Sequence, residues 1–277
     1  MITTYLNGRL GNNLFQYIFC RIAALESNCN FYIPKNKVES DNLYGLCSGK
    51  LSVNLEKSKP TNPHYWLGDE IFNINYGVFD DYLTSHKKEN DFELTNVQDI
   101  KNGTLLEGYY QTDNYMWEYR DKIINTWLPF KDDIIFKSKH ILEKYNVGEY
   151  CYIHFRGKDY KGIKQFYLPI DYYTKAIDKI KEVSGYSKFL IITDDVVEAF
   201  KFFPEYEIVS NDVGVDFYLL TKSKYSIICN SSFSWWASWM NEMSKIVIAP
   251  NKWFNYNGNY GEGFYPHHIK TDKFYYI

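Results

Sequence analysis

Apolar and polar positions alternate in a regular way along the second half of the chain. Short β-prone apolar runs are separated by amphipathic stretches of about a dozen residues. The runs predict strands at 150–155, 188–193, 206–210, 225–229 and 245–249, and the stretches between them predict helices at 170–183, 195–203, 214–223 and 232–243. Strands that alternate with helices are typical of βαβ units, so this half predicts a doubly wound parallel sheet.

The first half begins in the same way but is less regular afterwards. An apolar run at 2–6 predicts a strand, the segment 8–13 is a glycine loop, and apolar residues at helical spacing follow. We expect further strands at 30–33 and 104–110, helices at 114–127 and 132–145, and only short strands and loops over 34–103. The pattern changes after 146–148, which suggests two lobes, 1–146 and 147–277. The fold class is therefore α/β with two Rossmann-like lobes, clearest in the C-terminal half.

Composition indicates an ordinary globular protein. Of 277 residues, 45% are apolar and 23% charged, with a net charge of −3, which does not suggest a general nucleic-acid binder. No run of about 18 apolar residues predicts a membrane span, and residues 1–10 lack a signal-peptide pattern. Five scattered cysteines without a C-x-x-C pair fit buried thiols in a reducing compartment. We expect a soluble cytoplasmic protein, with peripheral membrane attachment left open.

Polar groups gather where four of the predicted strands end. These are His154 to Asp159, Thr193 to Asp195, Asn211 with Asp212 and Asp216, and Asn230 to Ser234. The carboxyl ends of parallel strands lie at one edge of a sheet, where α/β proteins bind ligands. Taken singly, Asp194, Asp195, Ser231 and Ser232 could equally be helix caps or first-turn residues. Four polar strand ends in succession favour a site.

Arg156 is the strongest single candidate in this set. The chain has only four arginines, and a planar, permanently charged guanidinium suits a phosphate group. The alternative is a surface ion pair at Arg156 and a packed strand-end histidine at His154. Asp194 and Asp195 could suggest Mg²⁺, but they start a helix and no third acid is obvious, so we expect no metal.

The glycine loop Gly8–Asn13 has the spacing G-x-x-G. It could bring backbone N–H groups to a pyrophosphate, or it could be only a tight turn. The dinucleotide fingerprint G-x-G-x-x-G is absent, which disfavours a dehydrogenase.

Four motifs resemble those of the family 11 glycosyltransferases, whose characterised members are mostly α-1,2-fucosyltransferases using GDP-fucose. They are G-R-L-G-N-N-L-F-Q-Y at 8–17, L-E-G-Y-Y-Q at 106–111, H-F-R-G-K-D-Y at 154–160 and N-S-S-F-S-W-W-A at 230–237. The resemblance implies a fold of the glycosyltransferase B type. The N-terminal lobe would take a glycan acceptor and the C-terminal lobe the nucleotide sugar. It further implies inverting transfer of L-fucose to O2 of a galactose-like residue, without a cofactor.

The resemblance and the polar strand ends together give the site residues. Arg156 would contact the β-phosphate of GDP, and Asp159 and His154 are the candidates for a general base. The substrate-binding candidates are Arg9, Gly11, Asn12, Asp194, Asp195, Asp216, Ser231, Ser232 and Phe233. The chain has Gly157 where the family has a second arginine, and Lys158 where it has glycine. This departure leaves two alternatives open, another nucleotide sugar as donor or a non-catalytic sugar- or nucleotide-binding protein.

Overall fold

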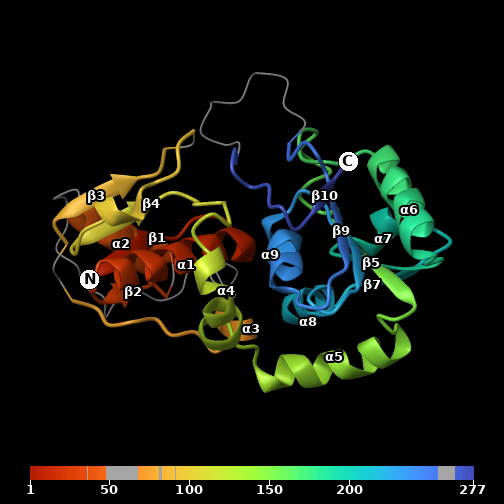
Figure 1. The fold of residues 1–277 in the computed structure, drawn as a ribbon, viewed down its shortest axis with the longest axis horizontal. Helices are drawn as coiled ribbons and strands as arrows, with labels where there is room; N and C mark the ends of the chain where they lie inside the picture. Colours follow the sequence, from red (N-terminus) through yellow and green to blue (C-terminus); the bar gives the residue numbers. More distant parts are fainter. Residues whose placement is uncertain (36, 48–67, 81–82, 91, 255–265) are drawn as a thin grey trace. The chain divides into compact units, whose positions relative to one another are not determined.

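The computed structural model describes residues 1–35, 37–47, 68–80, 83–90, 92–254 and 266–277. The chain forms two compact units, Met1–Pro129 with Pro266–Ile269, and Phe130–Tyr265 with Lys270–Ile277 (Figure 1). The division falls after Pro129 rather than at the expected residue 146. The helix α5 (Asp132–Lys144) accounts for the difference, because it packs against α8 (Val213–Leu220) of the second unit.

The first unit is built on a four-stranded parallel sheet. Its strands are β1 (Ile2–Tyr5), β2 (Phe31–Tyr32), β3 (Ser85–Lys88) and β4 (Thr104–Glu107), in the order β2-β1-β4-β3. The helices and helical turns are α1 (Leu10–Glu26), α2 (Lys37–Cys47), α3 (Gly68–Ile71), η2 (Val97–Asp99), η3 (Trp117–Tyr119), α4 (Arg120–Lys122) and η4 (Ile123–Trp127). Nearly every residue of α1 is buried, so this helix forms the core of the unit.

Two expectations for the first unit were wrong. The segment 34–103 was expected to hold only short strands and loops, but it contains the helix α2. Its apolar periodicity is weak, and tertiary packing decides the helix: Leu43 joins Met1, Tyr32 and Leu105 in an apolar cluster. The single helix expected over 114–127 is a succession of a 3₁₀ turn, one α turn and a π turn, beginning at Trp117.

The second unit has a six-stranded parallel sheet in the order β10-β9-β8-β5-β6-β7. The strands are β5 (Tyr150–Phe155), β6 (Lys188–Thr193), β7 (Glu207–Val209), β8 (Tyr225–Ile227), β9 (Ile246–Ala249) and β10 (Tyr275–Tyr276). The helices are α5, α6 (Ile170–Ser184), α7 (Val196–Phe202), α8 and α9 (Ser232–Met240). Apart from end residues and the unexpected β10, the predicted alternation is confirmed, and the α/β fold class with it.

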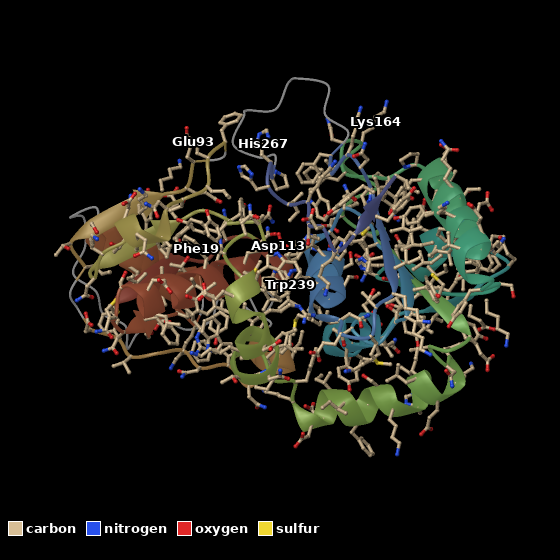
Figure 2. The ribbon with its side chains drawn as sticks, in the orientation of Figure 1. Phe19, Glu93, Asp113, Lys164, Trp239 and His267 are labelled. Carbon is tan, nitrogen blue, oxygen red and sulfur yellow. The ribbon has the colours of Figure 1, made fainter. Side chains whose placement is uncertain are left out.

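The core of the second unit is rich in aromatic rings. Trp235, Trp236 and Trp239 of α9 are fully buried, and the rings of Trp235 and Trp239 stack with centroids 6.1 Å apart. Figure 2 shows Trp239 on this helix. The thiols of Cys20, Cys151 and Cys229 are buried and free. Among the described residues, no helix is long and apolar enough to span a membrane.

Candidate functional site

The polar strand ends of the second unit meet at one edge of its sheet. Strands β8, β5, β6 and β7 are consecutive neighbours and all parallel, so their carboxyl ends lie side by side. In the register of β5 and β6, Phe155 lies beside Thr193. Arg156 directly follows β5 and Asp194 directly follows β6, so the strand pairing brings these two residues together.

The guanidinium of Arg156 is held by two carboxylates. Its Nε and Nη2 donate to Asp159 Oδ1 at 3.0 and 2.9 Å, and its Nη1 donates to Asp194 Oδ2 at 3.1 Å. The other oxygen of Asp194 accepts the backbone N–H of Gly157 at 2.8 Å. A guanidinium has five N–H donors, so these contacts fix its plane and leave one N–H on each Nη for a further acceptor.

Arg156 keeps its positive charge at this position. Burial alone would lower its pKa, but the nearby carboxylates of Asp194 and Asp159 offset this, and the pKa is raised. The side chain keeps 18% of its surface exposed. A fixed, partly exposed cation at the carboxyl edge of a parallel sheet can bind an anionic group.

The structure explains the glycine at position 157. A Cβ built on Gly157 would lie 2.4 Å from the Cβ of Asp195, which is too close for any side chain without a shift of the α7 start. Gly157 stands where the family motif has a second arginine, and the close packing of Asp195 leaves no room for a side chain at this position.

The two adjacent acids do different things. Asp194 pairs with Arg156, whereas Asp195 is the N-cap of α7 and accepts the N–H of Glu198 at 3.1 Å. Asp195 also forms an ion pair with Lys161 at 2.7 Å, and that contact leads the causes that lower its pKa. The cap interpretation therefore holds for Asp195. No group of three potential metal ligands occurs in the described part of the chain.

His154 lies beneath this edge, inside the protein. It is 4% exposed, its Nδ1 is 3.2 Å from the Sγ of Cys229, and its ring packs at 5.3 Å on Phe233. Burial, with a smaller effect of the Arg156 charge, lowers its pKa to about 3. The imidazole is therefore neutral at physiological pH, and these contacts describe a packed strand-end histidine.

Asp216 is a buried carboxyl in the first turn of α8. Its Oδ1 accepts Asn211 Nδ2 at 2.8 Å, and the backbone N–H of Asn211 also points to it. Burial raises its pKa to about 7, against the lowering effect of these hydrogen bonds, with smaller raising effects from Asp212 and Asp194. The influence of Asp194 places Asp216 within electrostatic reach of the Arg156 cluster.

Two residues that were not among the predicted site residues organise this edge, although Asn230 was noted as a polar strand end. Asn230 is 1% exposed, and its Nδ2 donates to the carbonyls of Phe166 at 2.9 Å and Trp253 at 2.6 Å. The hydroxyl of Tyr160 donates to the carbonyl of Asn230 at 3.2 Å. The Cζ of Arg156 lies 5.6 Å from the centre of the Tyr160 ring. Tyr160 belongs to the 154–160 motif and Asn230 to the 230–237 motif. The position of the Asn230 amide directly after an apolar run could have indicated its role from the sequence.

The serines of the same loop begin α9. Ser231 is the N-cap residue, although its side chain makes no cap hydrogen bond, and its carbonyl accepts the N–H of Trp235 at 3.0 Å. Ser232 and Phe233 are half-buried in the first turn of α9, which follows β8 along the chain.

The candidates Arg9, Gly11 and Asn12 belong to the first unit, at the start of α1. Arg9 is the exposed N-cap residue, Gly11 is buried, and Asn12 Oδ1 accepts Gln111 Nε2 at 2.8 Å. Gly8 has φ +83°, and a Cβ there would meet Asn12 Nδ2 at 2.3 Å, so the turn requires glycine.

Comparison with known proteins finds relatives that cover most of the chain. The profile of "Glycosyl transferase family 11" matches residues 1–264. An O-antigen biosynthesis glycosyltransferase, WbnK, from Escherichia coli is 29% identical, over 90% of this chain and 93% of that protein. An Escherichia coli alpha-1,2-colitosyltransferase is 26% identical, over 92% of each chain.

Solved structures share the fold at low identity. The fucosyltransferase NodZ from Bradyrhizobium superposes with a TM-score of 0.54 and 12% identity, over 89% of this chain and 94% of that one. POFUT1 in complex with GDP gives a TM-score of 0.50 and 11% identity, over 90% and 97% of the two chains. At these identities the likeness shows the fold alone.

Proposed function

The chain belongs to glycosyl transferase family 11 and is a glycosyltransferase, and we propose that it transfers L-fucose from GDP-fucose to a galactose-like acceptor with inversion, in an α-1,2 linkage. The observation that carries the proposal is Arg156, held in a fixed plane at the carboxyl edge of the second sheet. The structures of NodZ soaked with GDP-fucose and of POFUT1 with GDP support the choice of donor.

Arg156 would stabilise the negative charge of the leaving diphosphate. As the bond from C1 of the sugar to the β-phosphate oxygen breaks, negative charge grows on the diphosphate. The two N–H groups of Arg156 not used by the carboxylates would donate to that charge, which is electrostatic stabilisation of the transition state. Because Asp159 and Asp194 already fix the guanidinium, little reorganisation is needed during the reaction.

The acceptor oxygen attacks C1 from the face opposite the leaving group, which inverts the anomeric centre, and its proton must pass to a base. Of the two candidates, Asp159 has 36% of its side chain exposed, whereas His154 is buried and its pKa is lowered to about 3. Asp159 is therefore the more accessible of the two candidates for the proton acceptor. Asp194, Asp195, Asp216, Ser231, Ser232 and Phe233 are the proposed substrate-binding residues of the second unit, and Arg9, Gly11 and Asn12 are those of the first unit.

We propose that the reaction needs no metal or cofactor, since the fixed guanidinium supplies a positive charge for the diphosphate. The buried free thiols of Cys20, Cys151 and Cys229 are compatible with work in the cytoplasm.

One different donor is favoured by a specific observation. The colitosyltransferase similarity raises the 3-deoxy analogue of fucose as an alternative sugar on the same nucleotide. A donor screen by thermal shift with GDP-fucose, GDP-colitose, GDP-mannose and UDP-galactose separates these possibilities. Ligand at 100 times its Kd stabilises the folded state by about 2.7 kcal/mol.

Product analysis then tests the reaction itself. GDP-fucose and lactose should yield a trisaccharide whose anomeric NMR signal shows an α linkage to O2 of galactose. Donor binding without hydrolysis or transfer would support the alternative of a non-catalytic binding protein and refute the proposed activity.

A further inference from the structure

One face of the first sheet changes character along its strands. Tyr5, Glu107 and Lys88 are side by side in the register of β1, β4 and β3, so their side chains leave the sheet on the same face. Two residues earlier on β4, Leu105 is buried against Leu43 of α2. In the row of Leu105 the face is covered by α2, and His86 lies beside Leu105 in the register; one row further, at the carboxyl ends, the face carries Tyr5, Glu107 and Lys88.

Three rings meet over these two rows. The Tyr5 and Tyr44 ring centres are 5.3 Å apart, and those of Tyr44 and His86 are also 5.3 Å apart, nearly perpendicular at 82°. Tyr44 lies on α2 and is 39% exposed, and the His86 side chain is 34% exposed. An apolar floor thus continues into aromatic surface that is open to solvent.

Carboxylates border these rings. Tyr5 donates its hydroxyl to Asp41 Oδ1 at 3.0 Å, and His86 Nε2 lies 2.8 Å from Glu107 Oε2. Lys88 approaches Glu107 Oε1 at 3.7 Å. Tyr5 thus orients Asp41, whereas Glu107 keeps Oε2 buried beside His86 and has Oε1 on the side of Lys88.

We propose that these six residues, Tyr5, Asp41, Tyr44, His86, Lys88 and Glu107, form a subsite for a neutral hexose ring of the glycan acceptor. An aromatic ring offers a flat apolar surface for the C–H face of a sugar, and fixed carboxylate oxygens accept its hydroxyl protons. Ligands of α/β sheets bind at the carboxyl ends of the strands, where this cluster lies. The inference rests on the proposed function, because it assigns the acceptor of that reaction.

The test is acceptor kinetics of the full-length chain with lactose and N-acetyllactosamine as probes. Tyr44→Ala should raise the acceptor KM roughly tenfold, the size expected for loss of one aromatic contact. Tyr44→Phe keeps the ring and should retain the wild-type KM. Phe136→Ala removes a 79% exposed ring from α5 of the second unit and serves as the matched control.

A second measurement separates this inference from the activity. The thermal shift produced by GDP-fucose should be the same in wild type and Tyr44→Ala. Wild-type acceptor KM in Tyr44→Ala would overturn the subsite while leaving the proposed function intact. If the wild type transfers no sugar, the proposed function fails, and saturation-transfer NMR with lactose decides the subsite. Signals lost in Tyr44→Ala alone support it, and equal or absent signals in both proteins overturn it.

Discussion

Replacement of Arg156 by lysine is the most direct test of the donor site. Arg156 makes three contacts of 2.9 to 3.1 Å to two carboxylates, from three different nitrogens. A lysine ammonium is a single point charge and cannot bridge both acids while also facing a diphosphate. Arg156→Lys should therefore keep the local charge and lose the fixed orientation.

The expected loss is in the chemical step. Removing one preorganised donor from a developing anion typically lowers kcat by about 10²–10³-fold, or roughly 2.7–4 kcal/mol. An interaction made mainly in the transition state lowers kcat and kcat/KM together, so the donor KM should change little. Because a positive charge still neighbours Asp159 and Asp194, we expect the melting temperature to stay near that of the wild type.

Steady-state kinetics with GDP-fucose, combined with a melting curve, gives both quantities. Arg120→Lys makes the same exchange in the first unit and is the matched control. Near-wild-type turnover in a well-folded Arg156→Lys protein would refute the assigned role. A collapse of the melting temperature would instead show that Arg156 is chiefly structural.

Four other results are expected. Gly157→Ala should lower stability by about 1–3 kcal/mol in urea unfolding, because its Cβ would meet that of Asp195 at 2.4 Å; an unchanged midpoint would contradict the packing described. The folded pKa of Asp216 is raised to about 7, so its carboxyl binds protons more tightly in the folded state, and it should make stability fall as pH rises from about 4 to about 7. Asp216→Asn should remove that part of the pH dependence, and parallel curves for variant and wild type would count against it. Trp235→Ala should cost about 3–5 kcal/mol, since the ring is fully buried, whereas the 45% exposed Trp117→Ala should cost far less; equal losses would disprove the packing role. Activity should persist in EDTA, and a loss restored by Mg²⁺ or Mn²⁺ would show that metal ions serve the diphosphate.

Much of the second unit could be predicted from local sequence. Strands β5 and β6 are predominantly apolar runs, and each of the strands β5 to β8 is followed by a helix. Since a parallel sheet places all carboxyl ends on one edge, the polar strand ends could be assigned to one region without coordinates. The resemblance in four motifs, of which 230–237 is the longest and most specific of the second half, then indicated the family, and the profile match to residues 1–264 confirms it.

The first unit was harder because its elements depend on distant partners. The helix α2 has a weak apolar pattern, and packing of Leu43 against Met1 and Leu105 stabilises it. Without that helix, Tyr44 could not have been placed beside Tyr5 and His86. The aromatic cluster was therefore invisible in the sequence.

Side-chain partners were decided only by the tertiary structure. The sequence by itself determined that Arg156 and Asp194 both follow strands, but they are far apart along the chain. They meet because β5 and β6 are neighbours with Phe155 beside Thr193. Likewise, the sequence offered His154 as a base, and burial against Cys229 and Phe233 lowers its pKa to about 3. Local pattern fixes which residues end a strand, whereas strand order and burial decide which charges meet and which groups can carry a proton.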